Sequence, residues 1–267
     1  MGNAPIITLT TDFGYKDPFV GIMKGVILGI NPSINIVDIT HDIAPGNIMQ
    51  AAFAIETSFA YFPYKTIHLV VVDPGVGTMR RPIIVSTARH YLVGPDNGIF
   101  SRIYSIAESI DVFHVTAEHY FLSPRSKTFH GRDIFAPVAA WLSKGVDIMN
   151  FGEPISDYIN LPIPLPSFPA KNIIEGEIIY IDRFGNLTTN IHSQKIEDLL
   201  ENNKGKKMRV LVKGMEAPFR NFYADANDNG IYSLINSFNY IELFVKNGNA
   251  SLEFGLKVGD KVGVIFN

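Results

Sequence analysis

The chain has 267 residues, of which 46% are hydrophobic and 18% charged, and its formal net charge at pH 7 is −3. This composition is typical of a globular protein with one large or two smaller domains, and the negative charge argues against a protein built mainly to bind nucleic acid. It has no cysteine, which excludes disulfides and thiolate chemistry. It also lacks an apolar run of about 18 residues and the pattern of a secretion signal, so we expect a soluble, cytoplasmic protein that does not enter a membrane.

Short apolar strands alternate with amphipathic helices in the first part of the chain. Helical spacing of apolar residues over 19–30 stops at Asn31-Pro32, and a second helix is expected over 48–62, before Pro63. Such alternation predicts an α/β domain with a mostly parallel sheet flanked by helices. The expected strands are residues 6–10, 34–39, 69–72, 83–86, 90–93 and 112–115, and two further helices are expected, one up to about residue 105 and one ending near residue 145.

The pattern changes at residues 161–170, LPIPLPSFPA, which contain four prolines. A proline-rich segment of this kind is extended and semi-rigid, so it indicates a linker between an α/β domain at 1–165 and a second domain at 171–267. The second domain is expected to be antiparallel and barrel-like. Its expected strands are 177–182, 208–213, 241–245 and 261–266, with one helix from about residue 193.

The stretch LVVVDPGVGTMRRP, residues 69–82, organises the first domain. A continuous apolar run closed by turn residues indicates a strand buried on both faces. Asp73 then lies at the carboxyl end of that strand, where open α/β sheets place their ligands. Arg80 follows seven residues later and can fold back onto Asp73. The pair could take part in catalysis or anchor a ligand. The alternative is an ion pair that only fixes the loop.

Other loops also carry acids or histidines after expected strands. They contain Asp12 and Asp17, then Asp38, His41 and Asp42, and later His130, Arg132 and Asp133. Gathered at one edge, such side chains could form a metallohydrolase site, although no HExxH or HxH motif supports this. Asp12 is equally suited to cap the following helix. His41 and Asp42 are expected to hold their own loop. A functional role is favoured for His130.

In the second domain, IDRFGNLTTNI starts as a strand and turns at FGN. Asp182, Phe184 and Asn186 would present a carboxylate, a ring and an amide together, although a hairpin with an Asx turn explains the same letters.

Seven segments, in order, resemble one known family, the S-adenosyl-L-methionine (SAM) hydrolases, also called SAM hydroxide adenosyltransferases (formerly DUF62), which are relatives of the fluorinases and chlorinases. The segments are TDFGYKDPFVG, DITHDIAPGN, VVDPGVGTMRRP, VGPDNGIF, TFHGRDIFAPVAA, IDRFGNLTTNI and NSFNYIELFVKNG. The resemblance implies an N-terminal α/β domain, a C-terminal β-barrel domain, and a homotrimer whose SAM sites lie between neighbouring subunits. It implies no cofactor, with SAM as the substrate.

The resemblance also implies the site residues. The Asp–Arg–His set that positions water in the hydrolase branch corresponds to Asp73, Arg80 and His130. Gly131 stands where the halogenases have a serine that contacts halide, which argues against halogenation. The chain departs from the fluorinase at Phe238. The fluorinase has an arginine at this position, near the methionine carboxylate. The substrate-binding positions implied are Asp12, Thr128, Phe129, Asp182, Phe184, Asn186, Ser237 and Asn247.

The chemistry suits these residues. A sulfonium leaves as a neutral thioether and needs no general acid, so the enzyme must supply an aligned nucleophile. Asp73, Arg80 and His130 could each favour deprotonation of water, and the sequence does not decide which accepts the proton. The resemblance, with which this chemistry agrees, therefore implies hydrolysis of SAM to adenosine and L-methionine. A halogenase-like enzyme and a non-catalytic SAM- or adenosine-binding protein are the alternatives.

Overall fold

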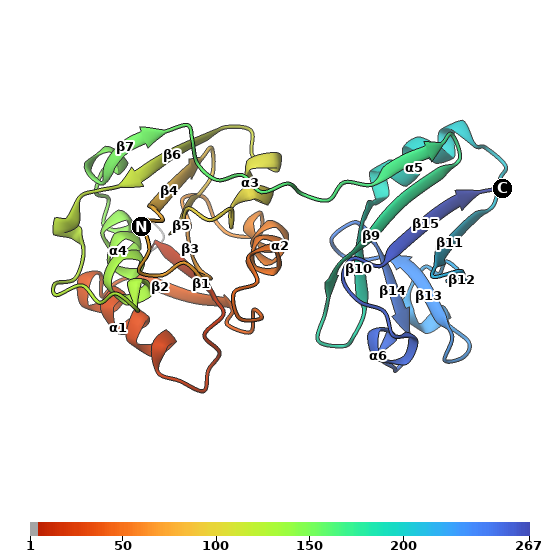
Figure 1. The fold of residues 1–267 in the computed structure, drawn as a ribbon, viewed down its shortest axis with the longest axis horizontal. Coiled ribbons are helices and arrows are strands. Elements are labelled where there is room, and N and C mark those ends of the chain that lie inside the picture. Colours follow the sequence, from red (N-terminus) through yellow and green to blue (C-terminus); the bar gives the residue numbers. More distant parts are fainter. Residues whose placement is uncertain (1–4) are drawn as a thin grey trace. The chain divides into compact units, whose positions relative to one another are not determined.

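The structure is a computed structural model that describes residues 5–267. It divides into two compact units, the first ending at Ile163 and the second beginning at Pro164. Each unit has its own sheet (Figure 1). Apolar side chains are buried on both faces of the first sheet and inside the second. None of the helices in the described part of the chain is both long and apolar enough to cross a membrane.

The first unit is built on a seven-stranded sheet with the order β2-β1-β3-β5-β4-β6-β7. The pairs β2/β1, β1/β3 and β3/β5 are parallel, whereas β5/β4, β4/β6 and β6/β7 are antiparallel. The α/β class is confirmed, with a mixed sheet whose parallel part is β2-β1-β3-β5. The strands are β1 Ile6–Thr11, β2 Asn35–Thr40, β3 Ile67–Val71, β4 Pro82–Thr87, β5 Tyr91–Pro95, β6 Ile110–Val115 and β7 Gly152–Ile155.

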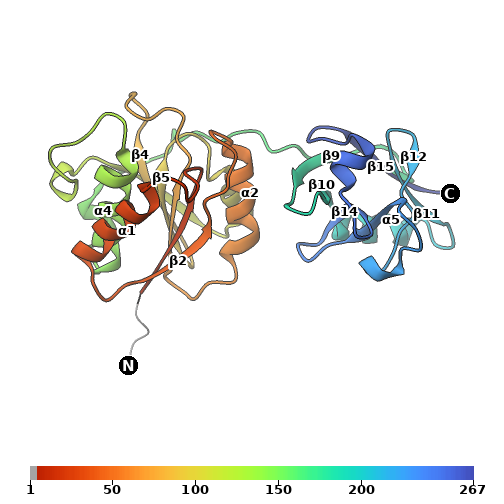
Figure 2. The ribbon, with the colours of Figure 1, turned by 90° about the horizontal axis from the view of Figure 1, so that it is seen from below.

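Helices cover both faces of this sheet. Helices α1 and α4 pack together on one face, and α2 and α3 lie on the other (Figures 1 and 2). Their bounds are α1 Phe19–Ile30, α2 Ile48–Phe59, α3 Ser101–Ile106 and α4 Ala136–Ser143, with single helical turns at Glu118–Tyr120 and Ile148–Asn150 and a π-helical segment at Gly131–Phe135. Helix α1 has the predicted bounds, but α2 ends three residues before the predicted position 62 because a turn at Ala60-Tyr61 precedes Pro63.

Strand β3 lies between β1 and β5, and all five of its residues are buried. This confirms the prediction of a strand covered on both faces. Leu69 and Val71 belong to the apolar core beneath α1 and α4, whereas Val70 and Val72 belong to the core beneath α2 and α3. Because alternate side chains leave a strand on opposite faces, one apolar run stabilises both layers.

The second unit is an antiparallel, nearly closed barrel-like sheet with the order β12-β11-β15-β9-β10-β14-β13. Residues 218–220, which follow β12, pair with Ser233 on β13, the strand at the opposite edge, and so help to close the sheet. Its strands are β8 Ser167–Ala170, β9 Ile173–Ile181, β10 Leu187–His192, β11 Met208–Val212, β12 Met215–Glu216, β13 Ile231–Ile235, β14 Tyr240–Val245 and β15 Lys261–Phe266; its helices are α5 Ser193–Asn202 and α6 Ala250–Phe254, with a 3₁₀ turn at Tyr223–Asp225.

Part of the expected linker is a strand. Ser167–Ala170 form β8, which pairs with β9 through Ser167 and Glu175 and through Ala170 and Ile173. Proline is tolerated in a strand that needs hydrogen bonds on one side only, so Pro169 does not prevent the pairing. The last four residues of the expected linker thus join the second sheet, which the proline content does not indicate.

Candidate active site

The loops that follow β1, β2 and β3 meet the start of the π-helical segment around one cavity of about 590 Å³ in the first unit. Because parallel strands end at the same edge of the sheet, these loops are adjacent although they are distant in sequence. The residues that line the cavity include Asp12, Phe13, Phe19, Gly46, Asp73, Thr128, Phe129, His130 and Gly131.

Arg80 joins the two other members of the expected catalytic set. Its Nε donates to Oδ1 and Oδ2 of Asp73 at 2.9 and 2.8 Å, and its Nη2 also donates to Oδ2. The same Nη2 lies 2.9 Å from Nδ1 of His130. The guanidinium rests over the ring of Phe135, with 5.0 Å between Cζ and the ring centroid. The structure therefore brings together Asp73, Arg80 and His130, and the predicted pairing of Arg80 with Asp73 is confirmed.

This contact defines the protonation of His130. An arginine Nη2 can only donate, so Nδ1 of His130 accepts and the ring of the neutral histidine carries its hydrogen on Nε2. Burial lowers the pKa of His130, and the positive charge of Arg80 lowers it further. His130 is therefore neutral at pH 7, with Nε2–H as its remaining hydrogen-bond donor.

A glycine allows the loops that carry these residues to touch. Gly77 has a φ of +81°, and a Cβ atom there would lie 2.4 Å from the backbone oxygen of Lys127. Only glycine permits this conformation and this approach together. The loop between Asp73 and Arg80 is thus packed directly against the segment that leads to His130.

Asp12 lies on the loop after β1, and its Oδ2 accepts a hydrogen bond of 2.8 Å from the backbone N–H of Gly46. It does not cap α1, which begins after Pro18 without a side-chain cap. Phe129 forms an aromatic cluster with two rings that the sequence analysis did not single out, Phe13 at 6.0 Å and Phe19 at 5.2 Å between centroids. In the sequence, the only indication of this cluster is that Phe13 directly follows Asp12.

Asp38 and His41 have structural partners. Asp38 lies within β2, not in the loop after it, and accepts hydrogen bonds from Lys24 and Tyr15. His41 contacts the hydroxyl of Thr11 at 2.7 Å, as expected for a residue that holds its loop. Among the residues that the structure describes, no group of three or more histidine or acidic side chains is placed to hold a metal ion.

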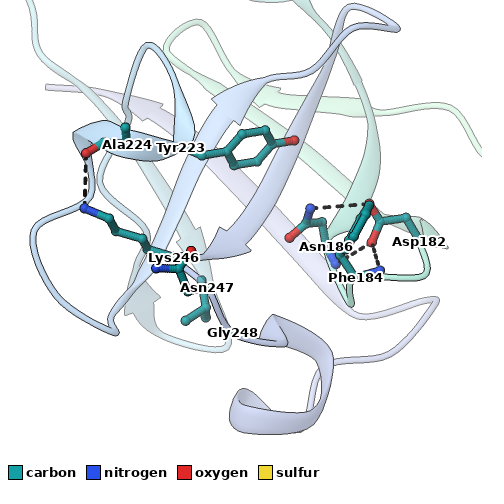
Figure 3. Close-up of a pocket in the computed structure, with 9 residues that line it drawn as sticks. Asp182, Phe184, Asn186, Tyr223, Ala224, Lys246, Asn247 and Gly248 are labelled. Carbon is teal, nitrogen blue, oxygen red and sulfur yellow. Dashed lines mark hydrogen bonds between the residues drawn. The ribbon is translucent and has the colours of Figure 1, made fainter.

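A second cavity, of about 760 Å³, lies in the second unit. Asp182, Phe184 and Asn186 line it from the loop after β9, and Lys246, Asn247 and Gly248 line it from the turn after β14 (Figure 3). Oδ1 of Asp182 accepts from the backbone N–H groups of Phe184 and Asn186, both at 2.9 Å, which confirms the Asx turn. The Asx turn directs Asp182 and Asn186 toward the same cavity.

Not every expected residue is found at this cavity. Ser237 is exposed in the turn between β13 and β14 and is not among the lining residues. Phe238 follows it in the same turn and is 37% exposed. Tyr223, which the sequence analysis did not identify, does line the cavity. Its segment, NFYADAND, has the composition of a surface loop, so nothing in the local sequence distinguishes it.

Comparison with known families covers most of the chain. Residues 7–152 match the SAM hydroxide adenosyltransferase N-terminal domain, and residues 176–263 match the SAM hydroxide adenosyltransferase C-terminal domain. The (R)-S-adenosyl-L-methionine hydrolase of Methanocaldococcus jannaschii is 34% identical over 98% of this chain and 96% of its own. That of Salinispora arenicola is 31% identical over 99% of both chains.

More distant relatives and solved structures agree with this match. A fluorinase of an Actinoplanes species is 26% identical over 97% of both chains. The crystal structure of an uncharacterized conserved protein from Thermotoga maritima superposes with a TM-score of 0.89 and 34% identity, over 97% of this chain and 99% of that one. The chain therefore belongs to the SAM hydroxide adenosyltransferase family.

Proposed function

We propose that this protein hydrolyses S-adenosyl-L-methionine to adenosine and L-methionine. The observation that carries the proposal is the contact of Arg80 with both Asp73 and His130 at a cavity that Asp12, Thr128 and Phe129 also line. The full-length relatives named (R)-S-adenosyl-L-methionine hydrolase support the same reaction, and their names specify the R configuration at sulfur. We extend this preference for the R epimer to the present chain.

In the proposed reaction, water attacks C5′ of the adenosyl group from the side opposite to sulfur. The new C–O bond forms as the C5′–S bond breaks, and the electron pair of that bond neutralises the sulfonium, so methionine leaves without protonation. The proton of the water passes to the enzyme. Holding the water and the carbon in this geometry can lower the barrier by about 7–11 kcal/mol in favourable cases.

The hydrogen bonds support one division of roles within the catalytic set. Within the described part of the chain, Oδ1 of Asp73 accepts a hydrogen bond only from Nε of Arg80, which leaves a lone pair for the water proton. His130 is a poor proton acceptor because its Nδ1 already accepts from Arg80. Its Nε2–H instead donates to the water oxygen and orients it. Asp73 is thus the general base, His130 orients the water, and Arg80 holds both side chains.

The remaining cavity residues suit the substrate. The Asp12 carboxylate is available to accept hydrogen bonds from a ribose diol, and the rings of Phe13, Phe19 and Phe129 favour a cation through cation–π attraction. A side chain at Gly131 would meet Met23 and Phe129 at 3.2 and 3.3 Å, so a serine there would be tightly confined. This supports water rather than halide as the nucleophile.

We also propose that the protein is a homotrimer in which the two cavities form complete sites between neighbouring subunits. Each cavity carries only part of the residue set that the family resemblance implies, with Asp12 and Phe129 in one and Asp182 and Asn186 in the other. A contact between two different surfaces of the same chain forms a closed ring when the rotation between subunits closes, as it would in a trimer. The absence of a cofactor and a cytoplasmic location stay predictions.

The test is incubation of the purified protein with each sulfur epimer of SAM, in buffer with and without chelator and with and without chloride, followed by chromatography. We expect adenosine and methionine from the R epimer in every buffer. Formation of 5′-chloroadenosine would instead establish a halogenase, and tight binding of SAM without adenosine over hours would establish a binding protein. Loss of activity in chelator would show that a metal is needed.

Two substitutions test the assigned roles. Asp73→Asn removes the proton acceptor and should lower kcat by a factor of about 10²–10⁴, with little change in KM. Asp42→Asn, on an exposed loop residue, is the control and should leave kcat unchanged. An Asp73→Asn variant with a normal kcat would exclude Asp73 as the base.

A further inference from the structure

A buried carboxylate lies behind the cavity of the second unit, and the proposed reaction does not use it. Glu242 is on β14 and is 6% exposed. Its partners on the two neighbouring strands are Thr188 on β10 and Leu234 on β13, neither of which carries a charge. A buried carboxylate is costly unless its oxygens accept hydrogen bonds, so the partners of Glu242 show what it does.

Each oxygen of Glu242 accepts one hydrogen bond. The hydroxyl of Tyr223 donates to Oε1 at 2.6 Å, and Nδ2 of Asn236 donates to Oε2 at 3.2 Å. The amide of Asn236 cannot turn over, because its Oδ1 accepts from the backbone N–H groups of Phe238 and Tyr240 at 3.0 and 3.1 Å. The Asn236 side therefore always donates, and only the Tyr223 side can change.

These bonds determine what Tyr223 offers to the cavity that it lines. A phenol has one hydrogen, and Tyr223 directs it to Glu242. Its oxygen can then only accept a hydrogen bond from a ligand. Tyr223 lies in the same cavity as Asp182 and Asn186 (Figure 3).

We propose that Glu242 is a positioning residue that fixes the Tyr223 hydroxyl as a hydrogen-bond acceptor, so that the cavity selects a ligand group with an N–H donor at this place. An exocyclic amine or an ammonium group has this chemistry, and SAM carries both. The inference deepens the proposed function and rests on it for the identity of the ligand. Glu242 acts through Tyr223 and does not touch the reacting atoms.

The arrangement makes ligand affinity depend on the protonation of Glu242. Burial raises the pKa of Glu242, the charge of Asp182 raises it further, and the hydrogen bonds from Tyr223 and Asn236 oppose the rise. A proton on Glu242 must lie toward Tyr223, since the Asn236 side is already a donor. The Tyr223 oxygen then accepts a hydrogen bond from the protonated Glu242 carboxyl. The hydroxyl hydrogen of Tyr223 points away from Glu242. A fall in pH therefore reverses the hydrogen bond between Tyr223 and Glu242. It also weakens the binding of a ligand N–H group to the Tyr223 oxygen.

Glu242→Gln reproduces the reversed state at every pH. The amide nitrogen of the glutamine must face Tyr223, because Asn236 already donates to the other side of residue 242. In calorimetry with SAM and with adenosine from pH 5.5 to 8.5, the unsubstituted protein should lose affinity as the pH falls. Glu242→Gln should bind about tenfold more weakly at pH 8, the effect of one lost hydrogen bond, and its affinity should not change with pH in this way.

Two further variants complete the test. Tyr223→Phe should weaken binding to a similar degree and also remove the pH dependence, and the double variant should be no weaker than either single one. Glu216→Gln, on an exposed residue of β12 paired with Arg209, is the matched control and should bind normally. The kcat of each variant should change less than its KM.

The outcomes are distinct. If either folded variant, Glu242→Gln or Tyr223→Phe, keeps the affinity and the pH profile of the unsubstituted protein, the inference is wrong. If the unsubstituted protein binds SAM or adenosine with the expected pH profile but forms no adenosine, the proposed reaction fails while the role of Glu242 stands. A protein that binds neither compound overturns both.

Discussion

The Nη2 atom of Arg80 lies 2.9 Å from Nδ1 of His130, and this contact decides which nitrogen of the imidazole carries the hydrogen. Because a guanidinium cannot accept a hydrogen bond, His130 faces the cavity with a donor when it is neutral. The same guanidinium is paired with Asp73, so one side chain aligns an acceptor and a donor on the site proposed for water.

Arg80→Lys tests this alignment. A lysine keeps the charge but cannot bind Asp73 through two nitrogens while it also contacts His130. We expect kcat to fall by about 10²-fold or more with a small change in KM, measured as adenosine release. Arg81→Lys makes the same change one residue later, at a side chain that pairs with Asp96 and Asp157 outside the cavity, and should retain its kcat. Equal losses in both variants would contradict the assigned role of Arg80.

Gly77→Ala tests whether the close approach of the two loops matters for activity. The new Cβ would lie 2.4 Å from the Lys127 oxygen, and the φ of +81° is itself unfavourable for alanine. Gly145→Ala is a matched control, since Gly145 has a φ of +85° but no atom within 4 Å of such a Cβ.

Both glycine variants should lose about 1 kcal/mol of the free energy of unfolding from backbone strain. Gly77→Ala should lose more and should also lower kcat, because the loop must move away from the segment that leads to His130. Urea unfolding and the adenosine assay measure the two effects. A normal kcat in Gly77→Ala would show that the contact is not needed for catalysis.

Two buried histidines far from the catalytic edge should make the fold sensitive to acid. Burial is the main cause that lowers the pKa of His68 to about 3 and that of His90 to about 4. In the unfolded chain both would titrate near their ordinary value of about 6.5. Stability is therefore complete above about pH 6.5 and is lost as the pH falls toward these folded values, by up to about 1.4 kcal/mol per pH unit for each histidine.

His90→Leu should reduce this dependence, so the free energy of unfolding should fall less between pH 6.5 and pH 4.5 than in the unsubstituted protein. His119→Leu removes an exposed histidine and should leave the slope unchanged. Urea titrations at several pH values measure the slopes. If His90→Leu keeps the original slope, the neutral state of His90 is not what links folding to pH.

Subunit mixing tests the shared sites. Asp73→Ala and Asp182→Ala should each be inactive as pure proteins, since one disables the first cavity and the other disables the second. If neighbouring subunits complete each site, random mixing of the two variants should restore activity in about a quarter of the sites. Inactive mixtures that form trimers on light scattering would contradict shared sites.

The sequence alone determined the features that depend on local patterns. The apolar spacing up to Asn31-Pro32 set the bounds of α1, and the run before Asp73 identified β3 as a strand covered on both faces. The pairing of Arg80 with Asp73 was also predictable, because both lie on one short loop. The list of expected strands left out β10, LTTNIH, because Thr188 and Thr189 look like exposed residues, although the hairpin alternative at FGN implied a strand there. Thr189 is instead fully buried, and its hydroxyl donates to the Ile241 oxygen on the next strand.

Only the tertiary structure decided the features that depend on contacts between distant residues. The protonation of His130 follows from a guanidinium 50 residues away in the chain, and the direction of the Tyr223 hydroxyl follows from a carboxylate on β14. A hydrogen bond has a donor and an acceptor, and their geometry exists only once the chain has folded. Residue types therefore name the groups that can react, whereas packing decides which of them donates and which accepts.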